Sequence, residues 1–110
     1  MADVLVLNAS NFESEVLKNP GAVLVDFTAT WCQPCHKLAP VVEELAKTYK
    51  PKGVKVGKVD VDENPDLAAQ YGVMGVPTLL FFKAGQVRDQ APFSPKAKIV
   101  EKLDRVLSGN

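Results

Sequence analysis

The sequence predicts an α/β fold in which a central mixed sheet of five strands is flanked by four helices, in the order βαβαβαββα. Short β-branched runs alternate with segments of helical periodicity, which indicates parallel strands joined by helices. Two later apolar runs are separated only by the turn "KAG", which predicts an antiparallel hairpin. The 110 residues contain no repeat or linker-like stretch, so we expect a single domain over residues 1–110.

The first half of the chain is expected to hold two strands and two helices. The run "VLVL" at residues 4–7 is a short strand, and Ser10 with Glu13 has the capping-box spacing that opens a helix through "FESEVLKN". "AVLVDF" at residues 22–27 is nearly all apolar, as in strands covered on both faces. Helical spacing then extends from Cys32 to about Tyr49. The two helices are ended by turn-forming residues: Asn19, Pro20 and Gly21, then Pro51 and Gly53.

The second half adds three strands and two helices. "VKVGKVDV" is a strand, and Asn64 with Pro65 opens a short helix "DLAAQY" that closes at Gly72. "TLLFF" and "QVRDQ" form the hairpin. Ser94 and Pro95 start the last helix, "KAKIVEKLDRVL".

Composition excludes several classes of protein. Thirteen lysines and arginines balance thirteen aspartates and glutamates, so no basic field attracts nucleic acid or an anionic membrane. The longest mostly apolar run, "VMGVPTLLFF", falls well below the ~20 residues of a membrane span. Two cysteines are too few for a disulfide scaffold, and the beginning "MADVLVLNAS" lacks the features of a secretory signal. We therefore expect a soluble cytoplasmic protein that acts as a monomer.

Both cysteines lie in "TATWCQPCHKLAP", residues 28–40, where the second strand passes into the second helix. Free N–H groups and the helix dipole stabilise a thiolate at Cys32, which makes this residue the predicted nucleophile. Cys35 lies one helical turn further in, shielded by apolar neighbours, and is the predicted resolving thiol. Pro34 fixes φ near the helical value and stiffens the ring that a Cys32–Cys35 disulfide would close.

Two other roles for these cysteines compete with a redox-active disulfide. A structural zinc site needs four ligands, and the chain offers only the two cysteines and His36, which projects about 100° round the helix from Cys35. A purely structural disulfide would close too short a loop to stabilise the fold much, and the cytosol would keep it reduced. We predict no metal site.

Three stretches carry a resemblance to a known family. "VDFTATWCQPC", followed by "VGKVDVDEN" and "YGVMGVPTLLFFKAG", is similar in order and spacing to the thioredoxin family over nearly the whole chain. The resemblance implies the thioredoxin fold and the reduction of protein disulfides by dithiol exchange. It also implies disulfide-containing target proteins and no bound cofactor. A thioredoxin reductase would supply the electrons, drawn from NADPH or from ferredoxin.

Asp26 interrupts the apolar second strand, where a carboxylate is costly without a partner or a role. Burial raises the pKa of such a group, so Asp26 is a candidate acceptor for the Cys35 proton, and the resemblance implies the same assisting role. Lys58, on the neighbouring strand, is its candidate charge partner. The alternatives are that Asp26 reaches solvent at the strand end and that Lys58 snorkels at the sheet rim.

A target surface is predicted beside the thiols. The resemblance implies that Pro77 follows a cis peptide bond next to the active-site disulfide, with the backbone of Gly75 and Val76 free to pair with an extended target segment. Trp31 would supply a flat apolar wall. The alternatives are core packing for Trp31 and, for Pro77, a proline that simply begins a strand.

The chain also departs from the family pattern. Gln33 stands where glycine is usual, and His36 replaces a lysine or arginine, so Gln33, Pro34, His36 and Lys58 are the candidates for tuning the redox potential. His36 as an exposed helix residue without a role is the alternative. Thr28 stands in place of a second tryptophan and Pro92 in place of a glycine, which indicates an altered docking surface.

Two competing functions share this fold. The first is a more oxidising disulfide oxidase or isomerase, although an isomerase commonly carries histidine where this chain has Pro34. The second is a non-catalytic binding module, which would tend to lose a cysteine, whereas both are present. A protein-disulfide reductase is the favoured prediction.

Overall fold

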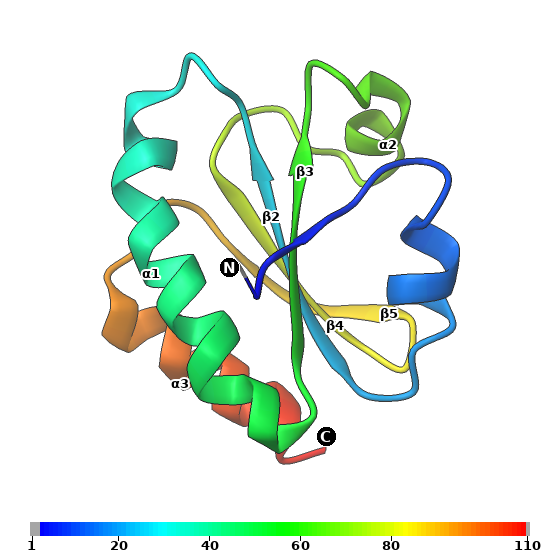
Figure 1. Ribbon diagram of the computed structural model, residues 1–110, viewed down its shortest axis with the longest axis vertical. Coiled ribbons are helices and arrows are strands. Elements are labelled where there is room, and N and C mark those ends of the chain that lie inside the picture. The colour runs from blue at the N-terminus through cyan, green and yellow to red at the C-terminus, as the bar shows by residue number, and fades with distance from the viewer. Residues whose placement is uncertain (1–2, 110) are drawn as a thin grey trace.

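The central sheet holds five strands in the order β1-β3-β2-β4-β5. A computed structural model describes residues 3–109 of the chain. The strands are β1 (Leu5–Val6), β2 (Ala22–Thr28), β3 (Lys55–Asp60), β4 (Thr78–Lys83) and β5 (Gln86–Ala91). β3 pairs in parallel with β1 and β2, whereas β4 is antiparallel to β2 and β5. The mixed five-stranded sheet predicted from the sequence is confirmed (Figure 1).

Helices cover both faces of this sheet (Figure 1). α1 (Gln33–Tyr49) and α3 (Lys96–Leu107) pack on one face, and α2 (Pro65–Gln70) and a short π-helical segment, η1 (Glu13–Leu17), pack on the other. A 3₁₀ turn, η2 (Lys50–Lys52), follows α1. Two apolar cores result, one on each side of the sheet, and they share only the strands between them.

β2 lies at the centre of the sheet and contributes to both cores. Its first six residues are all buried, as expected for a nearly continuous apolar strand. Side chains alternate along a strand, so Leu24 and Asp26 face α1 and α3, whereas Val23, Val25 and Phe27 face η1 and α2. Packing on both faces therefore fixes the position of the end of β2, from which the chain continues to α1.

The predicted capping box at the first helix is wrong. The N-cap of η1 is Phe12, which makes no side-chain capping bond, and the helix is shorter than expected. The Ser10 hydroxyl instead donates to Asn8 Oδ1 at 2.6 Å, and Asn8 N–H donates to Asn11 Oδ1 at 2.8 Å. The asparagine side chains thus form a turn of their own and take the serine out of the capping position.

Two other predicted helix starts lie where we expect them, but no side chain caps either helix. Asn64 is the N-cap of α2, yet its side chain donates back to the Asp60 carbonyl oxygen at 3.0 Å and does not cap the helix. The N-cap of α3 is Pro95, whereas the Ser94 hydroxyl donates to the Pro92 carbonyl oxygen. Pro65 and Lys96 then begin the two helices.

The β4–β5 hairpin closes through Ala84 and Gly85, which both have positive φ, 52° and 78°. This is the backbone that a tight two-residue hairpin requires. The tip packs against the end of η1, because a Cβ on Gly85 would meet the carbonyl oxygen of Leu17. Glycine is needed at this position for both its φ and its lack of a side chain.

A pair of glycine variants separates these two requirements. Gly53 also has positive φ, 81°, but a Cβ there meets nothing within 4 Å. We expect Gly53→Ala to lower the free energy of unfolding by about 1 kcal/mol, and Gly85→Ala to lower it by about 2 kcal/mol more, since the hairpin must move off η1. Urea unfolding of both variants measures the difference. Equal losses would contradict the packing assigned to the hairpin tip.

Candidate active site

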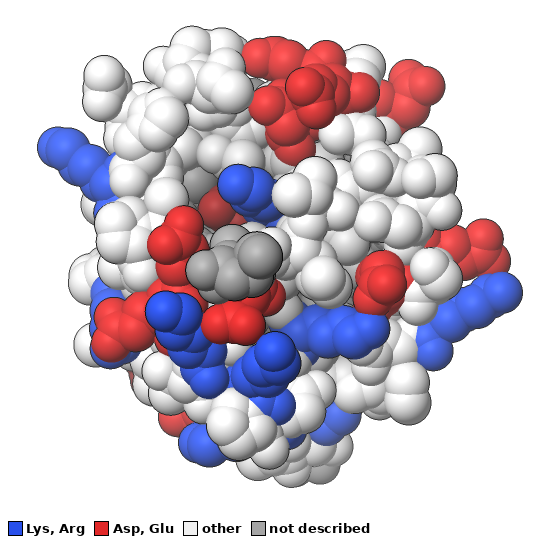
Figure 2. Space-filling model, in the orientation of Figure 1, with Lys and Arg blue, Asp and Glu red and all other residues white. Residues whose placement is uncertain are grey.

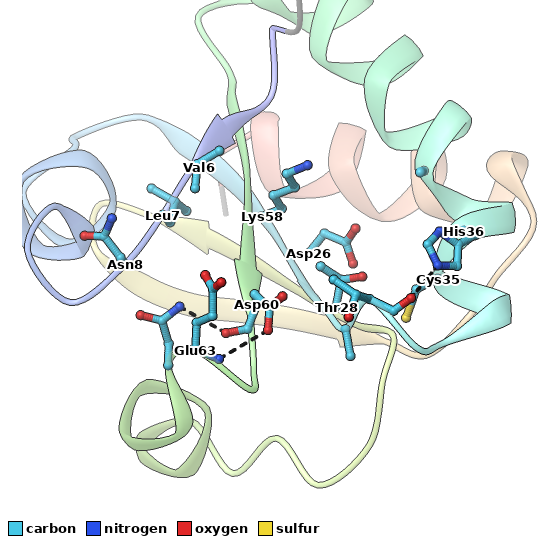
Figure 3. Close-up of a pocket in the computed structure, with 14 residues that line it drawn as sticks. Val6, Leu7, Asn8, Asp26, Thr28, Cys35, His36, Lys58, Asp60 and Glu63 are labelled. Carbon is cyan, nitrogen blue, oxygen red and sulfur yellow. Dashed lines mark hydrogen bonds between the residues drawn. The ribbon is translucent and has the colours of Figure 1, made fainter.

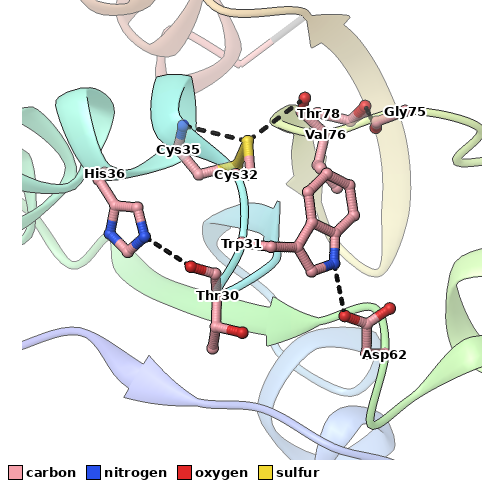
Figure 4. The surroundings of a disulfide bond; sticks show 9 residues. All are labelled: Thr30, Trp31, Cys32, Cys35, His36, Asp62, Gly75, Val76 and Thr78. Atoms are coloured by element: carbon pink, nitrogen blue, oxygen red, sulfur yellow. Dashed lines mark hydrogen bonds between the residues drawn. A yellow bond between two sulfur atoms is a disulfide. The ribbon is translucent and has the colours of Figure 1, made fainter.

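The two cysteines lie at the junction of β2 and α1 and are joined in a disulfide (Figure 4). Cys32 is the N-cap of α1, in extended backbone, and its sulfur accepts the Cys35 backbone N–H at 3.2 Å. The Cα atoms of the pair are 5.3 Å apart. Cys32 and Cys35 are 4% and 3% exposed. The first sulfur therefore lies where the unpaired N–H groups and the dipole of a 17-residue helix favour a thiolate.

The segment before β4 faces the disulfide from the opposite side. Cys32 Sγ lies 3.7 Å from the carbonyl oxygen of Val76, and the Val76–Pro77 peptide bond is cis. The Thr78 hydroxyl donates to the Gly75 carbonyl oxygen at 2.6 Å and braces the turn (Figure 4). The segment thus presents backbone beside the sulfur of Cys32.

Trp31 forms one side of a shallow groove next to this segment. Its side chain is 68% exposed, and its indole N–H donates to Asp62 Oδ2 at 2.7 Å (Figure 4). The alternative that Trp31 packs in the core is therefore wrong. The groove has a volume of about 120 Å³ and is lined by Trp31, Val61, Val73, Met74, Gly75 and Val76. Sequence reasoning missed Met74, because nothing in its local pattern distinguishes an exposed methionine from a buried one.

Asp26 lies behind the disulfide, near the end of β2. It is only 5% exposed, and its Oδ1 has no hydrogen-bond partner among the described residues. Burial raises the pKa of this carboxyl from 3.8 to about 6, although the positive charge of Lys58 acts in the opposite direction. Asp26 and Lys58 are register partners on adjacent parallel strands, so their side chains lie on the same face. The alternative that Asp26 reaches solvent at the strand end is wrong.

A cavity of about 490 Å³ opens in front of Asp26. α1, β1, β2, β3 and the start of the loop to α2 surround it, and Figure 2 shows the hollow in this face of the molecule. Figure 3 shows Asp26, Cys35, His36 and Lys58 around the cavity, with Asp60 and Glu63 nearer the loop to α2. The other lining residues are Val6, Leu7, Asn8, Thr28, Ala29, Thr30, Ala39 and Asn64. One open cavity therefore borders both the buried carboxyl and the second cysteine.

His36 bridges the edge of this cavity. Its Nε2 lies 2.7 Å from the Thr30 carbonyl oxygen (Figure 4). A carbonyl only accepts, so Nε2 must carry the proton in this bond. The bond ties the first turn of α1 to the loop that holds Cys32.

The remaining candidates have less specific surroundings. Gln33 and Pro34 are exposed in the first turn of α1. Thr28 lines the cavity. Pro92 is exposed after β5 and lines neither the groove nor the cavity.

Residues 3–109 contain neither a metal-binding cluster nor a membrane-spanning helix. No group of three or more histidine, cysteine or acidic side chains is placed to hold a metal ion. Within the same residues, no helix has the length and hydrophobicity needed to cross a membrane.

A disulfide at the start of a helix, opposite a cis-proline segment and above a buried carboxyl, defines the class of thiol–disulfide oxidoreductases. Comparison with known proteins gives the family. The thioredoxin family profile matches residues 3–105. The chain is 51% identical over 108 residues to a thioredoxin of Staphylococcus aureus, covering 97% of this chain and 100% of the relative. It is 48% identical over 95 residues to a thioredoxin of Chlorobaculum thiosulfatiphilum, covering 86% and 87%. The chain belongs to the thioredoxin family.

The raised pKa of Asp26 predicts how stability depends on pH. Between about pH 4 and pH 6 the unfolded chain releases this proton while the folded protein retains it, so the free energy of unfolding falls as pH rises. The loss is complete about one pH unit above the folded pKa, near pH 7, and amounts to about 3 kcal/mol. Asp26→Asn abolishes this fall, so the variant gains stability relative to wild type as pH rises.

Urea unfolding of the disulfide form from pH 4 to pH 8 tests this prediction. Asp66→Asn, which removes an exposed carboxylate from the first turn of α2, is the control and should follow the wild-type curve. If the Asp26→Asn curve ran parallel to wild type across this range, the raised pKa would be refuted.

Proposed function

We propose that this protein reduces disulfide bonds in other proteins, with Cys32 as the attacking thiolate and Cys35 as the resolving thiol. The observation that carries the proposal is the position of the cysteine pair, with Cys32 at the N-cap of α1 and beside the Val76 carbonyl. A target disulfide that approaches along the Trp31 groove would meet this sulfur first. Family membership supports the same chemistry.

The reaction proceeds from the reduced dithiol in two exchanges. The Cys32 thiolate attacks one sulfur of the target disulfide, forming a mixed disulfide while the other target sulfur leaves as a thiolate and takes up a proton. Cys35 then loses its proton and attacks Cys32 Sγ. The second target thiol is released and the Cys32–Cys35 disulfide forms. Two electrons pass from the protein to the target.

Asp26 accepts the Cys35 proton in this proposal. Both residues line the 490 Å³ cavity, so water there can link the thiol to the carboxylate. A group with a pKa of about 6 is mostly ionised at neutral pH yet remains basic enough to accept a proton. Lys58 limits the rise of this pKa and so keeps the acceptor charged.

Other residues bind targets or set the redox potential. Trp31, Gly75, Val76 and the cis Pro77 would hold an extended target segment beside Cys32, with backbone groups of the 75–76 segment pairing to it. Gln33, Pro34, His36 and Lys58 surround the disulfide and its cavity, and we propose that they tune its potential.

We also propose the reductase and targets of this protein, its domain organisation and its location in the cell. A thioredoxin reductase would regenerate the dithiol with electrons from NADPH or ferredoxin, and disulfide-containing proteins would be the targets. Residues 1–110 would act as one thioredoxin domain, a monomer in the cytoplasm, without a bound cofactor. The family match across residues 3–105 supports the single domain.

Reduction of insulin by dithiothreitol, followed by turbidity, tests the catalytic proposal. We expect Cys32→Ser to abolish the acceleration, because no thiolate remains at the N-cap of α1. Cys35→Ser should instead accumulate a mixed disulfide with the target, detectable by mass spectrometry. Activity of Cys32→Ser equal to wild type would show that the catalytic proposal is wrong.

Removing the proton acceptor should slow only the second exchange. We expect Asp26→Asn to slow resolution of a preformed mixed disulfide by roughly ten- to a hundredfold at pH 7. Glu63→Gln, at the exposed rim of the same cavity, is the matched control and should leave the rate unchanged. Stopped-flow measurement from pH 6 to pH 9 gives the profile. A rate unaffected by Asp26→Asn across that range would remove Asp26 from the mechanism.

A further inference from the structure

Met74 is the most exposed large hydrophobic residue among those described, at 98%. It lies between α2 and β4 and lines the groove beside Trp31, which is 68% exposed. The two side chains form a continuous apolar surface rather than isolated exposed residues. We propose that Met74 is an oxidation site in the target groove, where conversion of its thioether to a sulfoxide by a hydroperoxide weakens target binding without altering the cysteine pair. This proposal rests on the proposed disulfide-reductase function.

The position of Met74 relative to the reacting sulfur supports a contact with targets. Met74 is two residues from Val76, whose carbonyl oxygen lies 3.7 Å from Cys32 Sγ. Side chains that flank a target disulfide at Cys32 would therefore lie next to the groove that Met74 and Trp31 line. Methionine suits a surface that accepts varied partners, because it is unbranched, flexible and polarizable.

The chemistry needs only the thioether and the oxidant. The Met74 sulfur attacks the O–O bond of a hydroperoxide, one oxygen atom is transferred, and the sulfur loses two electrons. Hydrogen peroxide leaves as water, and an organic hydroperoxide leaves as an alcohol. In the disulfide form, Cys32 and Cys35 carry no thiolate and are 4% and 3% exposed, so Met74 holds the only thiol or thioether sulfur among residues 3–109.

The sulfoxide changes what the groove can bind. It converts a flexible apolar side chain into a polar, chiral one, which must be desolvated before it can lie against an apolar target residue. Targets with apolar side chains beside their disulfide should lose affinity, whereas a small disulfide that does not reach the groove should react as before. Methionine sulfoxide reductases reverse the modification, so the effect would be reversible.

Peroxide treatment of the disulfide form tests this proposal. After removal of peroxide, peptide mass mapping should show one added oxygen atom at Met74, and the only other methionine of the chain is Met1. We expect the KM for insulin to rise by roughly three- to tenfold, with little change in kcat. The rate with 5,5′-dithiobis(2-nitrobenzoate), a small disulfide, should be unchanged.

Met74→Leu is the matched variant, because leucine has a similar volume and no sulfur. Its kinetic constants are compared before and after peroxide, and we expect no change between the two. The proposal is overturned if Met74 stays unmodified while Met1 is oxidised, if the modified wild type keeps its KM, or if peroxide raises the KM of Met74→Leu equally. An untreated wild type that fails to reduce insulin would instead refute the reductase function itself, and this inference with it.

Discussion

Burial of β2 on both faces is the constraint on which the site depends. Six consecutive residues of this strand are shielded by the two cores, so its end and the start of α1 have little freedom to move. The loop between them carries Cys32 to the helix N-terminus. The same burial removes most of the solvent around Asp26 and raises the pKa of its carboxyl, which suits the proton acceptor that we propose. One packing arrangement therefore holds Cys32 at the start of α1 and raises the pKa of the Asp26 carboxyl.

The disulfide separates two surfaces that have different chemical tasks. On one side, the groove of Trp31, Met74 and Val76 is apolar apart from exposed backbone, as expected where an extended segment docks. On the other side, the cavity holds Asp26 and Lys58 and is polar enough for water. In the proposed mechanism, the Cys35 proton would leave toward the cavity while the target occupies the groove. A bound target would then not block the route by which Cys35 becomes a thiolate.

The order of elements and the place of the cysteines could be predicted because both depend on local pattern. The apolar run of β2 and the helical period after Cys32 fix the junction without further information. The prediction of a capping box was wrong because the Ser10 hydroxyl donates to Asn8 instead. That hydrogen bond depends on where the two side chains lie, which the spacing of Ser10 and Glu13 does not reveal. The exposure of Met74 and the cavity could not be predicted either. Both arise from how distant segments meet, which residue spacing along the chain does not encode.

Two residues with unfavourable surroundings, Asp26 and Met74, border the cysteine pair. Asp26 shares a cavity with Cys35, and Met74 shares a groove with Val76, whose carbonyl oxygen lies 3.7 Å from Cys32 Sγ. Asp26 is a carboxyl without a hydrogen-bond partner for Oδ1 among the described residues, and Met74 is an apolar side chain left in water. Each costs free energy that packing elsewhere must offset, and the two cores supply that packing without using either residue. Structural needs alone would favour an apolar residue at the first position and a polar one at the second. We attribute both positions to the proposed reaction, in which burial makes the Asp26 carboxylate more basic and exposure leaves Met74 open to a target.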